Sequence, residues 1–129
     1  MGRKGNHLRH LCKKIFMIKV YHNTRCSKSR DCLLFLEQSG KPYEVIEYLK
    51  DAPTVDELKD IIAKLGVKPI DIVRQKEEIW IEKYAGKKLR NEQIIRAMAK
   101  HPILIERPIV VNGDKAVIAR PLEKAGDII

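Results

Sequence analysis

The sequence lacks the features that mark several large classes of protein. It contains no run of 18 apolar residues, so no membrane-spanning helix is expected. Residues 1–16 include no apolar stretch of the length that a signal peptide needs, and we therefore expect a cytoplasmic protein. Neither a phosphate-binding loop nor a dinucleotide-binding glycine motif occurs. We therefore expect a protein without a bound cofactor.

Cysteine and aromatic residues are scarce. The three cysteines among 129 residues are Cys12, Cys26 and Cys32. An odd number without a regular spacing argues against a secreted disulfide scaffold and is typical of free thiols in a reducing cytosol. Only one tryptophan and two phenylalanines accompany the net charge of +9, and no known nucleic-acid-binding module is present. Direct binding to nucleic acid is therefore not expected.

The positive charge is concentrated near the beginning of the chain. Residues 1–16 carry five lysines and arginines and no acidic residue, which leaves +4 on the rest of the chain. Regular patterns begin just before Met17. We therefore expect residues 1–16 to be a disordered or non-native extension, and residues 17–129 to form one domain. Potential metal ligands in the extension lack a fourth partner, so no metal site is expected. They are His7, His10 and Cys12.

A strand–helix–strand unit is predicted first. Residues 15–21 alternate roughly and are rich in β-forming types. Residues 27–39 have the pattern of a helix that ends at Gly40, and residues 43–48 alternate with a period of two. This order is typical of two parallel strands joined by a helix. The helix residues expected to face the core are Leu33, Leu34 and Leu36.

Several helices and a hairpin follow. Thr54 and Glu57 have the spacing of a capping box, which predicts a helix that ends at Gly66. Further helices are predicted over residues 70–74, 77–84 and 91–100, the last capped by Asn91. From Ile103 onward, two apolar strands around Asn112-Gly113 predict a β-hairpin. A short helix over residues 121–129 completes the chain.

The expected fold class is α/β. Neither the first two strands nor the hairpin can bury both of its faces alone. The simplest arrangement is a mixed β-sheet with helices on both faces.

Cys26 lies in a polar turn, within the segment Y-H-N-T-R-C-S-K-S-R. A lone cysteine is more often a small buried hydrophobe than a nucleophile, but an apolar pocket is not built from such neighbours. At the start of a helix, the unpaired amides and the helix dipole favour a thiolate and also form a cradle for anions. Arg25, Lys28 and Arg30 add positive charge. The pattern predicts a thiol with a lowered pKa that attacks a bound oxyanion or a disulfide.

A second reactive thiol is missing from this segment. Residues 26–29 read C-x-x-S, so a thiol that resolves an adduct of Cys26 must come from elsewhere. Cys32 lies nearly two turns further along the helix and is displaced in angle. We expect Cys32 to pack on the helix face rather than to react.

Five motifs in the same order resemble the glutaredoxin-linked arsenate reductases, the ArsC family. They are Y-H-N-T-R-C-S-K-S-R, Y-L-K-D-A-P-T, V-R-Q-K, H-P-I-L-I-E-R-P-I-V-V and A-R-P. The resemblance covers residues 17–129. It implies a thioredoxin-like mixed β-sheet flanked by helices, with a helical insertion. It also implies that Arg107-Pro108 occupies the cis-proline position of that fold.

The resemblance also implies roles for individual residues. Cys26 would be the nucleophile, and three arginines would bind the oxyanion and its thiol adducts: Arg74, Arg107 and Arg120. Guanidinium groups suit this task because they stay charged and present forked donors.

The active-site loop of the family is matched by His22, Asn23 and Ser29. His22 is expected to bond the loop, to tune the thiolate or only to order the turn. Ser29 can donate to the thiolate or to the anion. The chain departs from the well-studied enzymes at Ser27-Lys28, where they have Gly-Thr, and at Thr24, where many members have proline.

The function implied by the resemblance is arsenate reduction in a monomeric enzyme. The Cys26 thiolate attacks arsenate, glutathione forms a mixed adduct as co-substrate, and glutaredoxin regenerates the thiol as arsenite leaves. A first alternative is a thiol oxidoreductase of the same fold that reduces or deglutathionylates another substrate. A second is a redox-responsive regulator of the Spx type, which binds RNA polymerase. Such regulators commonly carry C-x-x-C and lack the full arginine set, whereas this chain has C-x-x-S and all three arginines.

Overall fold

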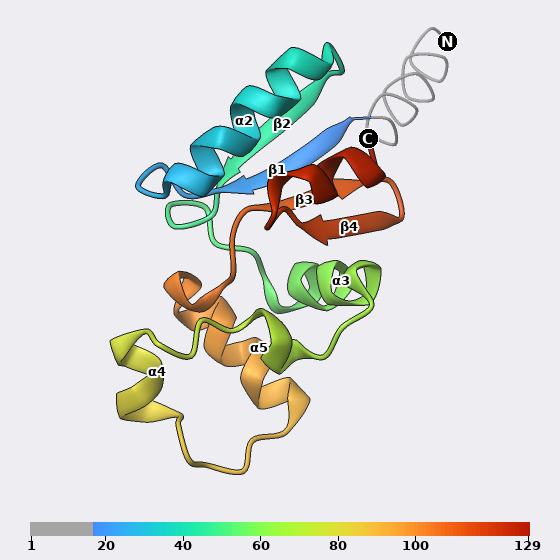
Figure 1. Cartoon of the computed structure of the whole chain (residues 1–129). Helices are drawn as coiled ribbons and strands as arrows, with labels where there is room; N and C mark the ends of the chain where they lie inside the picture. Colours follow the sequence, from blue (N-terminus) through green and yellow to red (C-terminus); the bar gives the residue numbers. More distant parts are fainter. Residues whose placement is uncertain (1–16) are drawn as a thin grey trace, which may run out of the picture.

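The computed structural model describes residues 17–129 (Figure 1). The expectation that residues 1–16 are a disordered or non-native extension concerns a segment outside the described residues. Among the described helices, none has the length and apolar character that crossing a membrane requires.

The predicted parallel unit is present. Strand β1 (Ile18–His22) pairs in parallel with β2 (Tyr43–Glu47), and α2 (Ser27–Ser39) connects them. Helix α2 ends at Gly40, whose φ of 72° lies in the left-handed region that glycine adopts without steric cost. Cys26 immediately precedes the first helical residue, so the helix start lies at the end of β1.

The hairpin consists of β3 (Ile109–Asn112) and β4 (Lys115–Ile118), which pair antiparallel. Strand β3 also pairs antiparallel with β1, and the strand order in the sheet is β2-β1-β3-β4. The sheet is therefore mixed, as predicted. The last segment is a 3₁₀ helix, η3 (Leu122–Asp127), in place of the short helix expected over residues 121–129.

The prediction that the first strand of the hairpin begins at Ile103 was wrong. Residues Pro102–Leu104 form a 3₁₀ helix, η2, and Ile105 makes an isolated bridge with Val73. Regular pairing begins only at Ile109, after the Arg107–Pro108 peptide bond, which is cis as the resemblance implied. Proline has a fixed φ and no amide hydrogen, so Pro102 and Pro108 interrupt a segment whose apolar composition favours a strand.

The helical insertion lies between β2 and β3. It contains α3 (Val55–Leu65), η1 (Pro69–Ile72), α4 (Glu78–Lys83), α5 (Asn91–Lys100) and η2. The predicted capping box is formed, since the Glu57 amide donates to Thr54 Oγ1 at 3.1 Å and the Thr54 amide donates to Glu57 Oε1 at 3.3 Å. Asn91 does not cap α5. The cap is Arg90, whose amide donates to Gln93 Oε1 at 2.8 Å.

Helices cover both faces of the sheet. In Figure 1, α2 lies on one side of the strands, and α3 and α5 lie on the other. Successive residues of β1 and β3 point to opposite faces of the sheet. Val20 and Val110 therefore pack with the α2 face, whereas Ile109 and Val111 pack with α3 and α5. This arrangement confirms the predicted α/β fold.

Helix α2 buries a narrow stripe. Ser29, Cys32 and Leu36 are fully buried, each with 0% of the residue exposed. Cys32 and Leu36 are four residues apart and therefore share one helix face. Leu34, which we expected to face the core, lies about 200° from Cys32 around the helix axis and is 60% exposed.

Leu34 and Leu36 offer a matched test of this packing. We expect Leu36→Ala to lower the free energy of unfolding by about 2–5 kcal/mol, because it opens a cavity beneath the sheet. Leu34→Ala removes the same atoms from an exposed position and should change it by less than about 0.5 kcal/mol. Urea denaturation followed by circular dichroism measures both. Equal losses would contradict the orientation of α2.

Candidate active site

Cys26 is the N-cap residue of α2. Its φ and ψ of −99° and 120° are extended, and the polypeptide turns into the helix directly after it. The Cys26 amide donates to the carbonyl of Asn23 at 3.0 Å, and the Cys26 carbonyl accepts from the Arg30 amide at 3.1 Å. Only 8% of Cys26 is exposed. The backbone thus holds the sulfur at the open end of the helix.

The loop before Cys26 is held by Asn23 and Ser29. Asn23 Oδ1 accepts from the Arg25 amide at 2.9 Å, and the Asn23 amide donates to Ser29 Oγ at 3.4 Å. Both residues are buried, and so is His22. His22 Nδ1 has no hydrogen-bond partner among residues 17–129. Burial lowers the pKa of His22, against an opposing effect of Glu47, so the ring is neutral at neutral pH.

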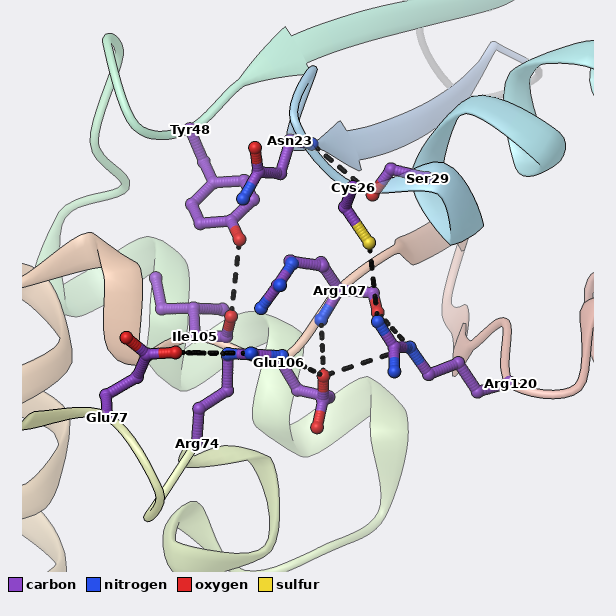
Figure 2. A network of polar contacts seen from close by, with 10 residues as sticks. All are labelled: Asn23, Cys26, Ser29, Tyr48, Arg74, Glu77, Ile105, Glu106, Arg107 and Arg120. Atoms are coloured by element: carbon purple, nitrogen blue, oxygen red, sulfur yellow. Dashed lines mark hydrogen bonds and ion pairs between the residues drawn. The ribbon is translucent and has the colours of Figure 1, made fainter.

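Two of the three predicted arginines lie beside the thiol. Arg120 Nη2 donates to Cys26 Sγ at 3.4 Å, and Arg120 Nε donates to the carbonyl of Arg107 at 2.7 Å (Figure 2). Both residues precede a proline in a cis peptide bond. Arg107 Nε is buried and has no hydrogen-bond partner among the described residues. An acceptor on a ligand would satisfy this donor.

The surroundings of Cys26 favour the thiolate. Burial by itself raises the pKa of Cys26, but the backbone amides of Ser29 and Lys28 and the side chain of Arg107 lower it more, to about 7. The side chains expected to supply positive charge, Arg25, Lys28 and Arg30, are exposed. The stabilising charge comes from Arg107, which is distant in sequence.

Cys32 behaves differently. It is fully buried against the sheet, and burial raises the pKa of its thiol to about 11. The expectation that Cys32 packs on the helix face is confirmed.

Arg74 belongs to the same polar network but contacts carboxylates. Its Nε and Nη2 lie 3.2 and 3.1 Å from Glu77 Oε2, and its Nη1 lies 3.3 Å from Glu106 Oε1. The Arg74 amide also donates to the carbonyl of Leu104 at 2.7 Å. This bond ties the segment after η1 to the segment before Arg107, and so brings Arg74 to the site.

Three residues of the network were not identified from the sequence: Tyr48, Glu77 and Glu106. Tyr48 is 1% exposed, and its hydroxyl donates to the carbonyl of Ile105 at 3.3 Å. Burial raises the pKa of Tyr48 to about 12, so it stays a donor. Glu106 had a signal in the sequence, because it is the one charged residue of the run I-L-I-E that precedes Arg107. Tyr48 is the first residue of the motif Y-L-K-D-A-P-T but was not singled out, and Glu77 had no signal.

A small cavity lies on the far side of Arg120 and is not lined by Cys26. It has a volume of about 350 Å³, and its lining includes Lys28, Asp31, Arg120 and Glu123. Arg120 therefore contacts both the cavity and the sulfur. A groove of about 620 Å³ lies elsewhere, near Met17 and Tyr21, and is not lined by a cysteine. Within the described part of the chain, no group of three or more His, Cys, Asp or Glu side chains is placed to hold a metal ion.

The fold and the site together define a thioredoxin-like protein with a thiolate at the start of a helix. A family model described as the ArsC family matches residues 21–128. Arsenate reductase of Neisseria meningitidis serogroup A is 45% identical over 108 residues, which are 82% of this chain and 92% of that protein. The Escherichia coli protein called uncharacterized protein YfgD is 41% identical over 114 residues, which are 87% and 96% of the two chains.

Solved structures agree with these relatives. The arsenate reductase from Vibrio cholerae matches with a TM-score of 0.84 and 41% sequence identity, over 88% of this chain and 98% of that one. The chain therefore belongs to the ArsC family.

The two described thiols should differ in reactivity with iodoacetamide. Because thiolate is the reactive form, the alkylation rate of Cys26 should rise with pH and reach half its maximum near pH 7. Cys32 should stay unmodified at neutral pH, since it is buried and its pKa is about 11. Peptide mass spectrometry follows each site separately. Faster alkylation of Cys32 than of Cys26 would contradict the site.

Proposed function

We propose that this protein is an arsenate reductase in which Cys26 is the single nucleophile and glutathione and glutaredoxin supply the electrons. The observation that carries the proposal is the Cys26 thiol, with a pKa of about 7, beside the guanidinium groups of Arg107 and Arg120. A nucleophile and a cluster of anion-binding donors meet at one helix start. The names of the Neisseria and Vibrio relatives support arsenate as the oxyanion.

The proposed reaction needs two external thiols. Cys26 Sγ forms a bond to arsenic, and one arsenate oxygen leaves as water after protonation. The sulfur of glutathione then bonds to arsenic and a second water leaves. A glutaredoxin thiolate attacks the glutathione sulfur to form a mixed disulfide, and the electron pair of the broken S–As bond reduces arsenic from +5 to +3. Water finally displaces Cys26 Sγ, which regenerates the thiolate and releases arsenite.

The arginines have separate tasks in this proposal. Arg107 donates to the oxyanion through its unpaired Nε, and Arg120 contacts the sulfur and also lines the small cavity. Arg74 adds positive charge to the site without contacting the sulfur. Guanidinium groups remain charged throughout and match oxyanion oxygens with forked donors. Asn23 and Ser29 hold the loop so that the amides of α2 face the sulfur.

An external resolving thiol follows from the position of Cys32. Cys26 and Cys32 are both free in the structure, and Cys32 is fully buried with a raised pKa. It is therefore poorly placed to attack an adduct of Cys26. This feature also suits the second candidate, a thiol oxidoreductase that reduces or deglutathionylates another substrate. The relationship to YfgD, whose name states no activity, keeps that candidate in view.

Coupled turnover of arsenate tests the proposal. With glutathione and glutaredoxin present, the wild-type protein should consume arsenate, and the rate should fall as the pH drops below about 7 because Cys26 becomes protonated. Cys26→Ser should abolish turnover, whereas Cys32→Ser should retain it. Consumption of NADPH by glutathione reductase, together with direct measurement of arsenite, reports the rate.

Each failure in this experiment has a separate meaning. Full activity in Cys26→Ser would remove Cys26 from the mechanism. No arsenate turnover by the wild type, together with release of glutathione from a glutathionylated peptide, would favour the second candidate.

A further inference from the structure

Glu106 is an ionisable group at the centre of the network to which the proposed reaction gives no task. Its Oε1 lies 3.3 Å from Arg74 Nη1, 3.1 Å from the Arg107 amide and 4.0 Å from Arg120 Nε. One carboxylate oxygen thus contacts the guanidinium groups of Arg74 and Arg120 and the backbone amide of Arg107. Figure 2 shows this carboxylate among them, with Cys26 beyond the Arg120 guanidinium.

The contacts of Arg120 separate two sides of the site. Its Nη2 faces the sulfur, whereas its Nε faces the carbonyl of Arg107 and the carboxylate of Glu106. All three nitrogens of the Arg74 guanidinium contact carboxylates. Its Nε and Nη2 donate to Glu77, and its Nη1 donates to Glu106. Glu106 therefore binds the guanidinium groups from the side opposite the thiol, and it leaves Arg107 Nε and Arg120 Nη2 available to a ligand.

Glu106 is itself held in place. Its amide donates to the carbonyl of Ile72 at 2.8 Å, and the neighbouring Ile105 forms a bridge with Val73. The side chain is 27% exposed, so its charge is only partly screened by water. Three like charges that converge on one site repel one another, and a fixed carboxylate among them offsets this repulsion.

We propose that Glu106 is the positioning residue of this site, which holds Arg74 and Arg120 in place and limits how strongly the arginines attract anions. The effect on turnover rests on the proposed function, but the effect on the sulfur and on anion binding does not. The carboxylate has two separable properties. Its oxygen accepts hydrogen bonds from the arginine segments, and its charge opposes both the thiolate and an incoming oxyanion.

Two substitutions separate these properties. Glu106→Gln keeps an acceptor oxygen at the same place but removes the charge, so the remaining positive charge acts more strongly on the sulfur and on anions. Glu106→Ala removes the acceptor as well and frees Arg74 and Arg120 to move. Glu78→Gln is the matched control, since Glu78 is exposed, makes no ion pair with any described residue and gives the same change in net charge.

Alkylation of Cys26 by iodoacetamide, with and without arsenate as a protecting anion, tests the proposal. In Glu106→Gln, the midpoint of the pH profile should lie below that of the wild type, and half-protection should need about two- to fivefold less arsenate. In Glu106→Ala, half-protection should need about tenfold more arsenate than in the wild type. Glu78→Gln should match the wild type in both measurements. Circular dichroism verifies that each variant is folded.

Three results would overturn the proposal. The first is a pH profile of Cys26 alkylation in Glu106→Gln that coincides with that of Glu78→Gln. The second is unchanged protection by arsenate in folded Glu106→Ala. The third is weaker protection in Glu106→Gln, which would mean that the charge helps to bind anions. If Glu106→Ala fails to fold, the results for the isosteric Gln variant alone decide. Failure of arsenate to protect the wild type would count against the proposed function instead, while the shift of the midpoint would still test Glu106.

In turnover, the Gln variant should show a lower KM for arsenate without a matching rise in kcat. Added attraction acts on bound substrate and transition state alike, and such uniform binding does not speed the chemical step. A role confined to stability would leave the KM unchanged.

Discussion

The contact between the start of α2 and the arginines around β3 and β4 determines the chemistry of Cys26. A sulfur with only 8% of its residue exposed would ordinarily hold its proton. Here the backbone amides of Ser29 and Lys28, at the start of α2, stabilise the thiolate. The side chains of Arg107 and Arg120, from the other half of the chain, also contact the sulfur. Both the helix amides and the Arg107 side chain lower the pKa of the thiol, which is about 7. The fold is the means by which these two groups of donors meet.

The sheet makes this meeting possible. Strand β1 lies between β2 and β3, so the loop that carries Cys26 emerges beside the segment that leads into β3. Arg107 lies two residues before the start of β3, and its side chain is beside Cys26. A helical insertion of five short elements then returns the chain to the same point, where Arg74 bonds to the carbonyl of Leu104. The site is assembled from segments that are distant in sequence, including the residue after β4, Arg120.

Carboxylates are as much a part of the site as the arginines. Glu77 and Glu106 neutralise much of the charge of Arg74, and Glu106 also meets the amide of Arg107. A cluster of guanidinium groups without counter-ions would repel itself and would bind any anion tightly. With the carboxylates in place, the free donors are limited to those that face the sulfur.

The local chemistry of the chain was open to prediction where neighbours in sequence control it. The helix stop at Gly40, the capping box of Thr54 and Glu57, and the hairpin turn at Gly113 each depend on residues within a few positions of one another. The same holds for the place of Cys26 directly before a helix.

Only the tertiary structure decided which groups surround that thiol. The charges near it in sequence, on Arg25, Lys28 and Arg30, are exposed, whereas the effective guanidinium groups come from residues about 80 and 90 positions away. The contacts of Glu106 with all three predicted arginines were likewise invisible, because no spacing rule links residues brought together by strand order. Helix caps and turns depend on residues that are neighbours in sequence. The pKa of a thiol depends on its distance from charged groups in space, and the fold sets that distance.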